Sequence, residues 1–192
     1  MTDKAPADNT APDAPVRAAA SQVHGVEFSD VALELTRREL PDLDPMAFHL
    51  GMLLLRTANT HSQTSERLIH RPHGFTSSGF RILYTVWIFG QAEARDIARL
   101  SGVSRQATST VLATLEAEGL VVRERVSTTD RRLVSVRLSE AGAAAIKDAF
   151  AEQNRLEQDW FGDLTGDERL VLKSLLGRVA GRIARSARTT GD

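Results

Sequence analysis

Apolar residues recur at helical spacing over most of this chain. In one long segment they fall at steps of three, four and seven, which places them on one face of a helix. The residues of that stripe are Met46, Leu50, Leu53, Leu54, Thr57, His61 and Leu68. Helical spacing of this kind, interrupted at Pro and Gly, predicts helices over residues 27–40, 46–69, 76–90, 93–100, 104–119, 139–162 and 165–183.

Side chains that can cap a helix precede several of these segments. Asp44, Ser104 and Ser139 each have an oxygen that can accept from the free amides of a first helical turn. Thr165 and Glu168 have the spacing of a capping box. These capping residues predict where four of the helices begin.

Residues 122–126 and 133–138 instead alternate apolar and polar positions, as a half-buried hairpin would. Their connection, residues 127–132, is polar and has arginines at its tip. A short helix, a turn at Gly102, a helix with a polar face and this hairpin together describe a winged helix-turn-helix. The second helix fits a DNA major groove, and the hairpin can reach the adjacent minor groove. We expect a mainly α fold with a small β-hairpin wing.

The amphipathic helices at the two ends of the chain need a surface to bury their apolar faces. A twofold dimer, in which helices of both subunits pack together, would supply it and present two DNA-reading helices. We therefore expect a disordered tail over residues 1–25, dimerisation helices over 26–75, the winged domain over 76–138 and further dimerisation helices over 139–192.

Composition excludes several classes of protein. The chain has 192 residues, 42% of them hydrophobic, and contains no cysteine, which excludes disulfides and thiolate chemistry. It lacks a glycine-rich phosphate loop and any spaced nucleophile, base and acid, so an enzyme is not expected. There is no apolar run long enough for a signal peptide or membrane span, so a cytoplasmic protein is expected.

The net charge of -1 hides a local excess of positive charge. Residues 81–137 contain nine arginines and six acids, whereas the rest of the chain contains 15 basic and 19 acidic residues. Local charge, rather than the total, governs attraction to phosphates. The surplus of three positive charges gives modest support to DNA binding.

The order of these elements, the segment DIARLSGVSRQATSTVLATLEAEGLVVRERVSTTDRRLVSVRLSEAG and the wing pattern Asp130-x-Arg132 resemble the MarR family of bacterial transcription regulators. The resemblance covers residues 46–183. It implies a homodimer that binds a pseudo-palindromic, inverted-repeat operator, most often as a repressor. It also implies DNA contacts from the recognition helix, through Ser104, Arg105, Gln106, Thr108, Ser109 and Thr110.

In the wing, the resemblance assigns Arg132 to the minor groove. Asp130 matches the acid that holds the wing in shape, through Arg125 or Arg132, and Arg131 lies beside it at the tip. Ordinary solvated arginines are the alternative interpretation, which the surrounding motif disfavours.

The resemblance further implies a cleft for a small aromatic or anionic effector, for which His61, Phe80, Tyr84 and Trp87 are candidates. The peroxide-sensing branch needs a cysteine, which is absent. The urate-responsive branch pairs a tryptophan in its extra N-terminal helix with an aspartate, but residues 27–40 contain no tryptophan and Arg81 stands at the matching position. Urate is therefore disfavoured.

Two alternatives stay open. His61, His70 and His73 could bind zinc, but the last two flank a proline-containing loop without a cysteine or an acid obviously beside them, so no metal or cofactor is expected. The protein could also be a DNA-binding or anti-silencing factor that responds to no effector.

Overall fold

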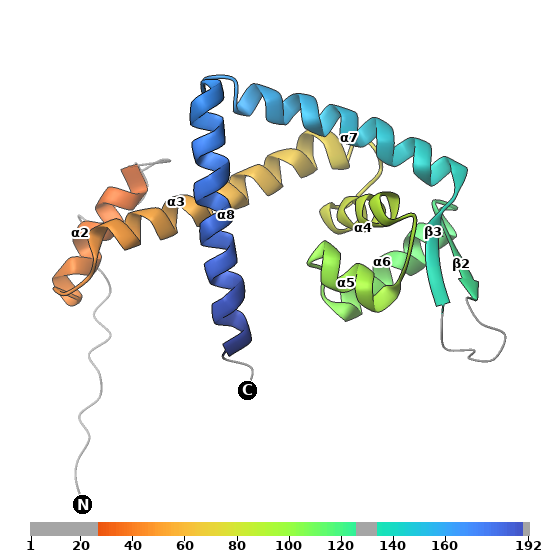
Figure 1. Cartoon of the computed structure of the whole chain (residues 1–192), viewed down its shortest axis with the longest axis horizontal. Helices are drawn as coiled ribbons and strands as arrows, with labels where there is room; N and C mark the ends of the chain where they lie inside the picture. The colour runs from red at the N-terminus through yellow and green to blue at the C-terminus, as the bar shows by residue number, and fades with distance from the viewer. Residues whose placement is uncertain (1–26, 126–133, 190–192) are drawn as a thin grey trace, which may run out of the picture. The chain divides into compact units, whose positions relative to one another are not determined.

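The computed structural model describes residues 27–125 and 134–189 (Figure 1). Its helices are α2 (Glu27–Glu39), α3 (Pro45–Ser65), α4 (Ser77–Phe89), α5 (Ala94–Ser101), α6 (Arg105–Ala117), α7 (Glu140–Trp160) and α8 (Gly166–Thr189). Its strands are β1 (Gln91–Glu93), β2 (Val121–Arg125) and β3 (Val134–Leu138). The expected fold class, mainly α with a small β wing, is confirmed. The predicted N-terminal tail and the hairpin tip lie outside the described residues.

The predicted caps explain where the helices begin. The Asp44 carboxylate accepts from the amides of Met46 and Ala47 at 2.9 and 3.1 Å. At the start of α8, Thr165 and Glu168 form the reciprocal bonds of a capping box, with lengths of 2.8 to 3.3 Å. These bonds satisfy amides that would otherwise have no partner within the first helical turn.

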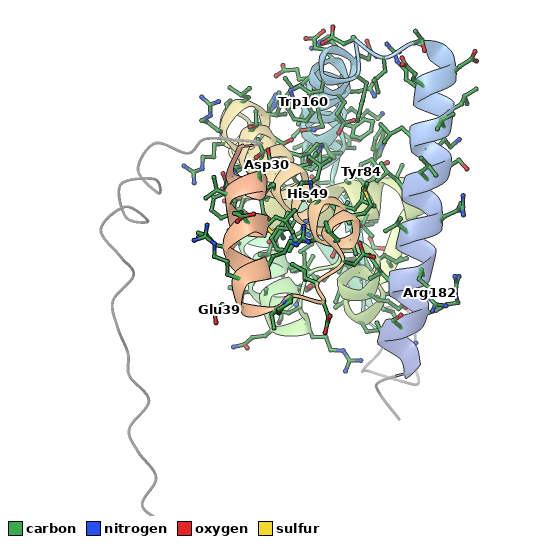
Figure 2. The ribbon with its side chains drawn as sticks, turned by 90° about the vertical axis from the view of Figure 1, so that its left-hand side faces the viewer. Asp30, Glu39, His49, Tyr84, Trp160 and Arg182 are labelled. Atoms are coloured by element: carbon green, nitrogen blue, oxygen red, sulfur yellow. The ribbon has the colours of Figure 1, made fainter. Side chains whose placement is uncertain are left out.

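The chain divides into two compact units between Ser62 and Gln63. In the first unit, the Arg56 guanidinium lies 4.9 Å from the centre of the Phe28 ring, which joins α3 to α2. His49 Nε2 lies 3.6 Å from Asp30 Oδ1 between the same two helices (Figure 2). Two side-chain contacts thus hold the additional N-terminal helix against α3.

The core of the second unit forms around α4. Ile82, Leu83 and Val86 on this helix are fully buried. Helices α5, α6 and α7 and strand β3 all pack against α4, as Figure 1 shows for the helices gathered beside the sheet. The remaining buried hydrophobic residues of this core include Ile97, Leu112, Leu115, Val136 and Ile146.

The wing sheet has the strand order β1-β3-β2, and both pairings are antiparallel. Strand β2 pairs with β3 from Val121 opposite Leu138 to Arg125 opposite Val134. On its other edge, β3 pairs with β1, a strand that the sequence analysis did not predict. Three residues are too few to show a clear alternation of polar and apolar positions.

The prediction of one uninterrupted α-helix over residues 46–69 is wrong at its C-terminal end. Regular α-helix ends at Ser65, and Glu66–His70 forms a π-helical turn. This turn is tied to neighbouring helices. Gln153 on α7 donates at 3.0 Å to the hydroxyl of Ser65, the buried residue just before the turn. The Ser77 hydroxyl, in the first turn of α4, donates to Glu66 at 2.7 Å.

The Glu66 carboxylate predicts a pH dependence of stability. The hydrogen bond from Ser77, assisted by Arg71, lowers the pKa of Glu66 below its ordinary value of 4.5. The charged form therefore stabilises the folded state above that value, and this contribution is lost as the pH falls through the lowered pKa. Glu66→Gln should lower the thermal midpoint at neutral pH, and its difference from the parent protein should shrink as the pH falls below 4.5.

Thermal unfolding of the parent and variant across the acidic range would measure this. Glu118→Gln is the matched control, since Glu118 is exposed at the end of α6 and should give a small difference at every pH. A Glu66→Gln difference that stays constant from neutral to acidic pH would contradict the assignment.

Candidate nucleic-acid interface

Helices α5 and α6 form a helix-turn-helix. Gly102 has φ of 66°, a left-handed conformation that glycine adopts without strain, and it turns the chain between the two helices. The Ser104 hydroxyl then caps α6 by accepting from the Ala107 amide at 3.3 Å. Val103, in the turn, is buried. The turn predicted at Gly102 and the cap predicted at Ser104 are both confirmed.

Helix α6 has one buried face and one exposed face. Leu112 and Leu115 are buried in the core, while Ala107 and Val111 are partly buried against it. The exposed face carries Ser104, Arg105, Gln106, Ser109 and Thr110. These are short or forked hydrogen-bonding groups, which can reach phosphates and base edges.

Thr108 is the exception among the predicted DNA-binding residues. Its side chain is fully buried, and its hydroxyl lies 3.4 Å from the Val103 carbonyl oxygen. The prediction that Thr108 contacts DNA is therefore wrong. Thr108 lies four residues before Leu112, on the helix face that packs into the core. Its position in the helical repeat therefore determines its burial, although its side chain is polar.

Two further positions belong to the exposed face. Ala113 and Thr114 follow Ser109 and Thr110 at a step of four residues and are exposed. The Thr114 hydroxyl donates to the Thr110 carbonyl oxygen at 3.3 Å, so it can still accept a hydrogen bond. The step of four was the sequence signal that could have extended the site by one turn.

The arginines near the helix-turn-helix differ in their ion pairs. Four of them pair with neighbouring carboxylates: Arg95 with Glu93, Arg99 with Asp96, Arg123 with Glu116 and Arg137 with Glu124. Within the described residues, neither Arg105 on α6 nor Arg81 on α4 forms an ion pair with a carboxylate. Among the described residues, the charge of Arg105 is thus not compensated by a carboxylate, and Arg105 lies at the start of the exposed face.

The wing is described at its base only. Arg125 is the last residue of β2, and its backbone lies opposite Val134. The side chain of Arg125, together with Asp130, Arg131 and Arg132, lies outside the described residues. Their roles stay a prediction.

The candidate effector residues have different surroundings. Phe80 is buried, and its ring stacks on His70 with centroids 4.2 Å apart. Tyr84 (Figure 2) and Trp87 are half-buried, and both contact Phe150 of α7, at centroid distances of 4.8 and 5.7 Å. His61 is exposed and belongs to the first unit. The structure thus brings Tyr84 and Trp87 together, and an effector cleft that includes His61 stays a prediction.

The histidines near the π-helical turn have other contacts. His70 is buried, with Nδ1 3.3 Å from the Ser77 hydroxyl, and His73 Nε2 lies 3.2 Å from Glu152. Among residues 27–125 and 134–189, no group of three His, Asp or Glu side chains could hold a metal ion. In the same two ranges, no helix is both long and apolar enough to cross a membrane.

Comparison with known proteins places this geometry in a family. The MarR family sequence model matches residues 73–133. An uncharacterised HTH-type transcriptional regulator of Bacillus subtilis, YwaE, is 32% identical over 154 residues, which cover 80% of this chain and 90% of the relative.

Solved structures agree in fold. A mutant of MarR from E. coli, complexed with operator DNA, has a TM-score of 0.58 at 26% identity. The match covers 69% of this chain and 96% of the MarR chain. Bordetella bronchiseptica BpsR, whose DNA binding is regulated by 6-hydroxynicotinic acid, has a TM-score of 0.62 at 24% identity. The match covers 68% of this chain and 98% of BpsR. The winged helix-turn-helix, the family match and the identity to YwaE together show that this chain belongs to the MarR family of transcriptional regulators.

Proposed function

We propose that this regulator is a homodimeric repressor that binds a pseudo-palindromic operator and is released from it by a small aromatic or anionic molecule. The observation that carries the proposal is the exposed polar face of α6, which begins at Arg105, a residue without a carboxylate partner in the described part of the chain. Base edges are read by such groups in the major groove, and the wing would add contacts in the minor groove.

The exposed apolar residues of α8 support dimerisation. Leu175, Leu176, Val179 and Ile183 recur at steps of one, three and four, and each is 45% to 56% exposed in the single chain. Helix α3 exposes a similar series that includes Met46, Leu50 and Leu53. A second copy would bury both faces and hold two α6 helices about 34 Å apart, one DNA turn.

The half-buried aromatic cluster of Tyr84, Trp87 and Phe150 supports an aromatic effector. Aromatic rings stack favourably in offset or edge-to-face geometries. The cluster joins α4, which packs against α5 and α6, to α7. BpsR, a structural relative regulated by a hydroxylated aromatic acid, provides a chemical class with which to begin.

Arg105→Ala should weaken operator binding by about 1–3 kcal/mol, because the variant loses a specific contact at the start of the recognition helix. Fluorescence anisotropy with an operator selected from random DNA, and with a scrambled duplex, would measure it. Arg99→Ala is the matched control: it removes the same charge from the adjacent helix, but Arg99 is paired with Asp96. Equal losses for both variants on both duplexes would show that Arg105 contributes only general charge.

Leu175→Glu should convert the dimer into monomers, since it places a charge within the apolar stripe of α8. Sedimentation velocity would follow the change, and a truncation just before Leu164 should have the same effect. Ser174→Glu provides the control, because Ser174 lies on the opposite face of α8 and should leave the dimer intact. A folded dimer that survives both Leu175→Glu and the truncation would exclude α8 as the interface.

Hydroxylated aromatic acids should lower operator affinity by roughly fivefold or more, which corresponds to the usual coupling between effector and DNA sites. The response would be measured by adding each acid to the preformed complex of protein and operator. Trp87→Leu should reduce it, whereas Ile88→Leu, at an exposed neighbouring position, should not. Operator binding that no acid in the series weakens would favour the alternative, a factor without an effector.

A further inference from the structure

The connection between β3 and α7 is hydrogen-bonded to the residues that follow the recognition helix, α6. The Ser139 hydroxyl donates to the Gly119 carbonyl oxygen at 2.7 Å, and the Ser139 amide donates to the Leu120 carbonyl oxygen at 3.0 Å. The same hydroxyl accepts from the Gly142 amide at 2.9 Å, which caps α7. Ser139 therefore joins the residues that follow α6 to the first turn of α7.

Gly142 brings the two segments closer than any other residue would allow. A Cβ atom added to Gly142 would overlap the Leu120 carbonyl oxygen, and it would also crowd the Leu120 Cα at 3.2 Å. These are backbone atoms, which cannot rotate aside as a flexible side chain can. Gly142 is also buried, so α7 cannot move outward without opening the core.

Leu120, in turn, is fixed to the recognition helix. Its amide donates to the Leu115 carbonyl oxygen at 2.8 Å, and the Gly119 amide donates to Glu116 at 3.0 Å. The chain of contacts from α6 through Leu120 to Gly142 and Ser139 thus contains only backbone atoms and one short side chain. Such a joint has few internal degrees of freedom.

We infer that the Ser139 and Gly142 joint positions the recognition helix relative to the dimer axis and thereby sets which spacing of operator half-sites the protein accepts. This rests on the proposed dimer, in which α8 supplies the interface. Helix α7 has 21 residues and leads from the joint to α8, a distance of about 30 Å. A small tilt at its first turn would therefore become a large displacement between the two recognition helices.

The mechanism follows from the geometry of DNA. Adding one base pair between half-sites moves them apart and also rotates one relative to the other, because the duplex completes a turn in about 10 base pairs. A rigid joint cannot follow this change without deforming protein or DNA, which costs binding free energy. A loosened joint would follow it with less strain. Ser139 and Gly142 are thus positioning residues and need not touch DNA.

The test uses the full-length protein and a series of duplexes in which the half-sites of the selected operator are moved closer or further apart by single base pairs. The parent protein should prefer one spacing, with affinity on the order of tenfold lower one base pair away. Gly142→Ala should flatten this preference or move its maximum to another spacing. Ala144→Ser is the control, because Ala144 is exposed in the same part of α7, and the spacing preference of this variant should match that of the parent.

Ser139→Ala and Ser139→Thr complete the series. The alanine variant adds no atoms, so it tests the joint even if Gly142→Ala does not fold. It should flatten the spacing preference, while the threonine variant, which keeps the hydroxyl, should restore it. Sedimentation and thermal unfolding would establish that each variant is a folded dimer.

The outcomes separate the two proposals. A folded, dimeric Ser139→Ala protein with the spacing preference of the parent would overturn the role of the joint and leave the proposed function intact. A parent protein that is monomeric, or that binds all spacings equally, would instead count against the proposed dimeric operator complex.

Discussion

The burial of one face of α4 is the constraint on which the winged domain depends. Ile82, Leu83 and Val86 are fully enclosed by α5, α6, α7 and β3. Each such side chain contributes about 1.5–3 kcal/mol relative to its exposed state. The same core that stabilises the domain therefore aligns the helix that precedes the turn, the recognition helix and the central strand of the wing. The orientation of the polar face of α6 is fixed because the apolar face of the same helix packs on this core.

Local signals in the sequence were enough to predict much of the fold. The caps at Ser104 and Ser139 and the capping box at Thr165 each depend on residues within one helical turn, so sequence spacing determines them. Features that depend on tertiary contact were missed. Strand β1 exists because β3 pairs with it, and the π-helical turn at Glu66 is bonded to Ser77. Neither partner is visible from the local pattern.

The sequence also predicted only part of the candidate DNA-binding site. Arg105 and Gln106 were correctly placed on an exposed face, but Thr108 was assigned by its polarity although its position favours the interior. Ion pairing between these charges is visible only in the structure. Counting arginines gave a surplus of three, whereas the ion pairs of Arg95, Arg99, Arg123 and Arg137 distinguish compensated charge from the charge that Arg105 retains.

The strand order β1-β3-β2 determines which strand edges another chain could reach. Exposed strand edges can pair with other chains and lead to aggregation. Because β1 covers one edge of β3 and β2 covers the other, the central strand of the described sheet offers no free edge at its base. The outer strand β2 carries Arg123 and Glu124, charged residues that discourage further pairing. The described part of the sheet therefore offers only the outer edges of its two short flanking strands to another chain.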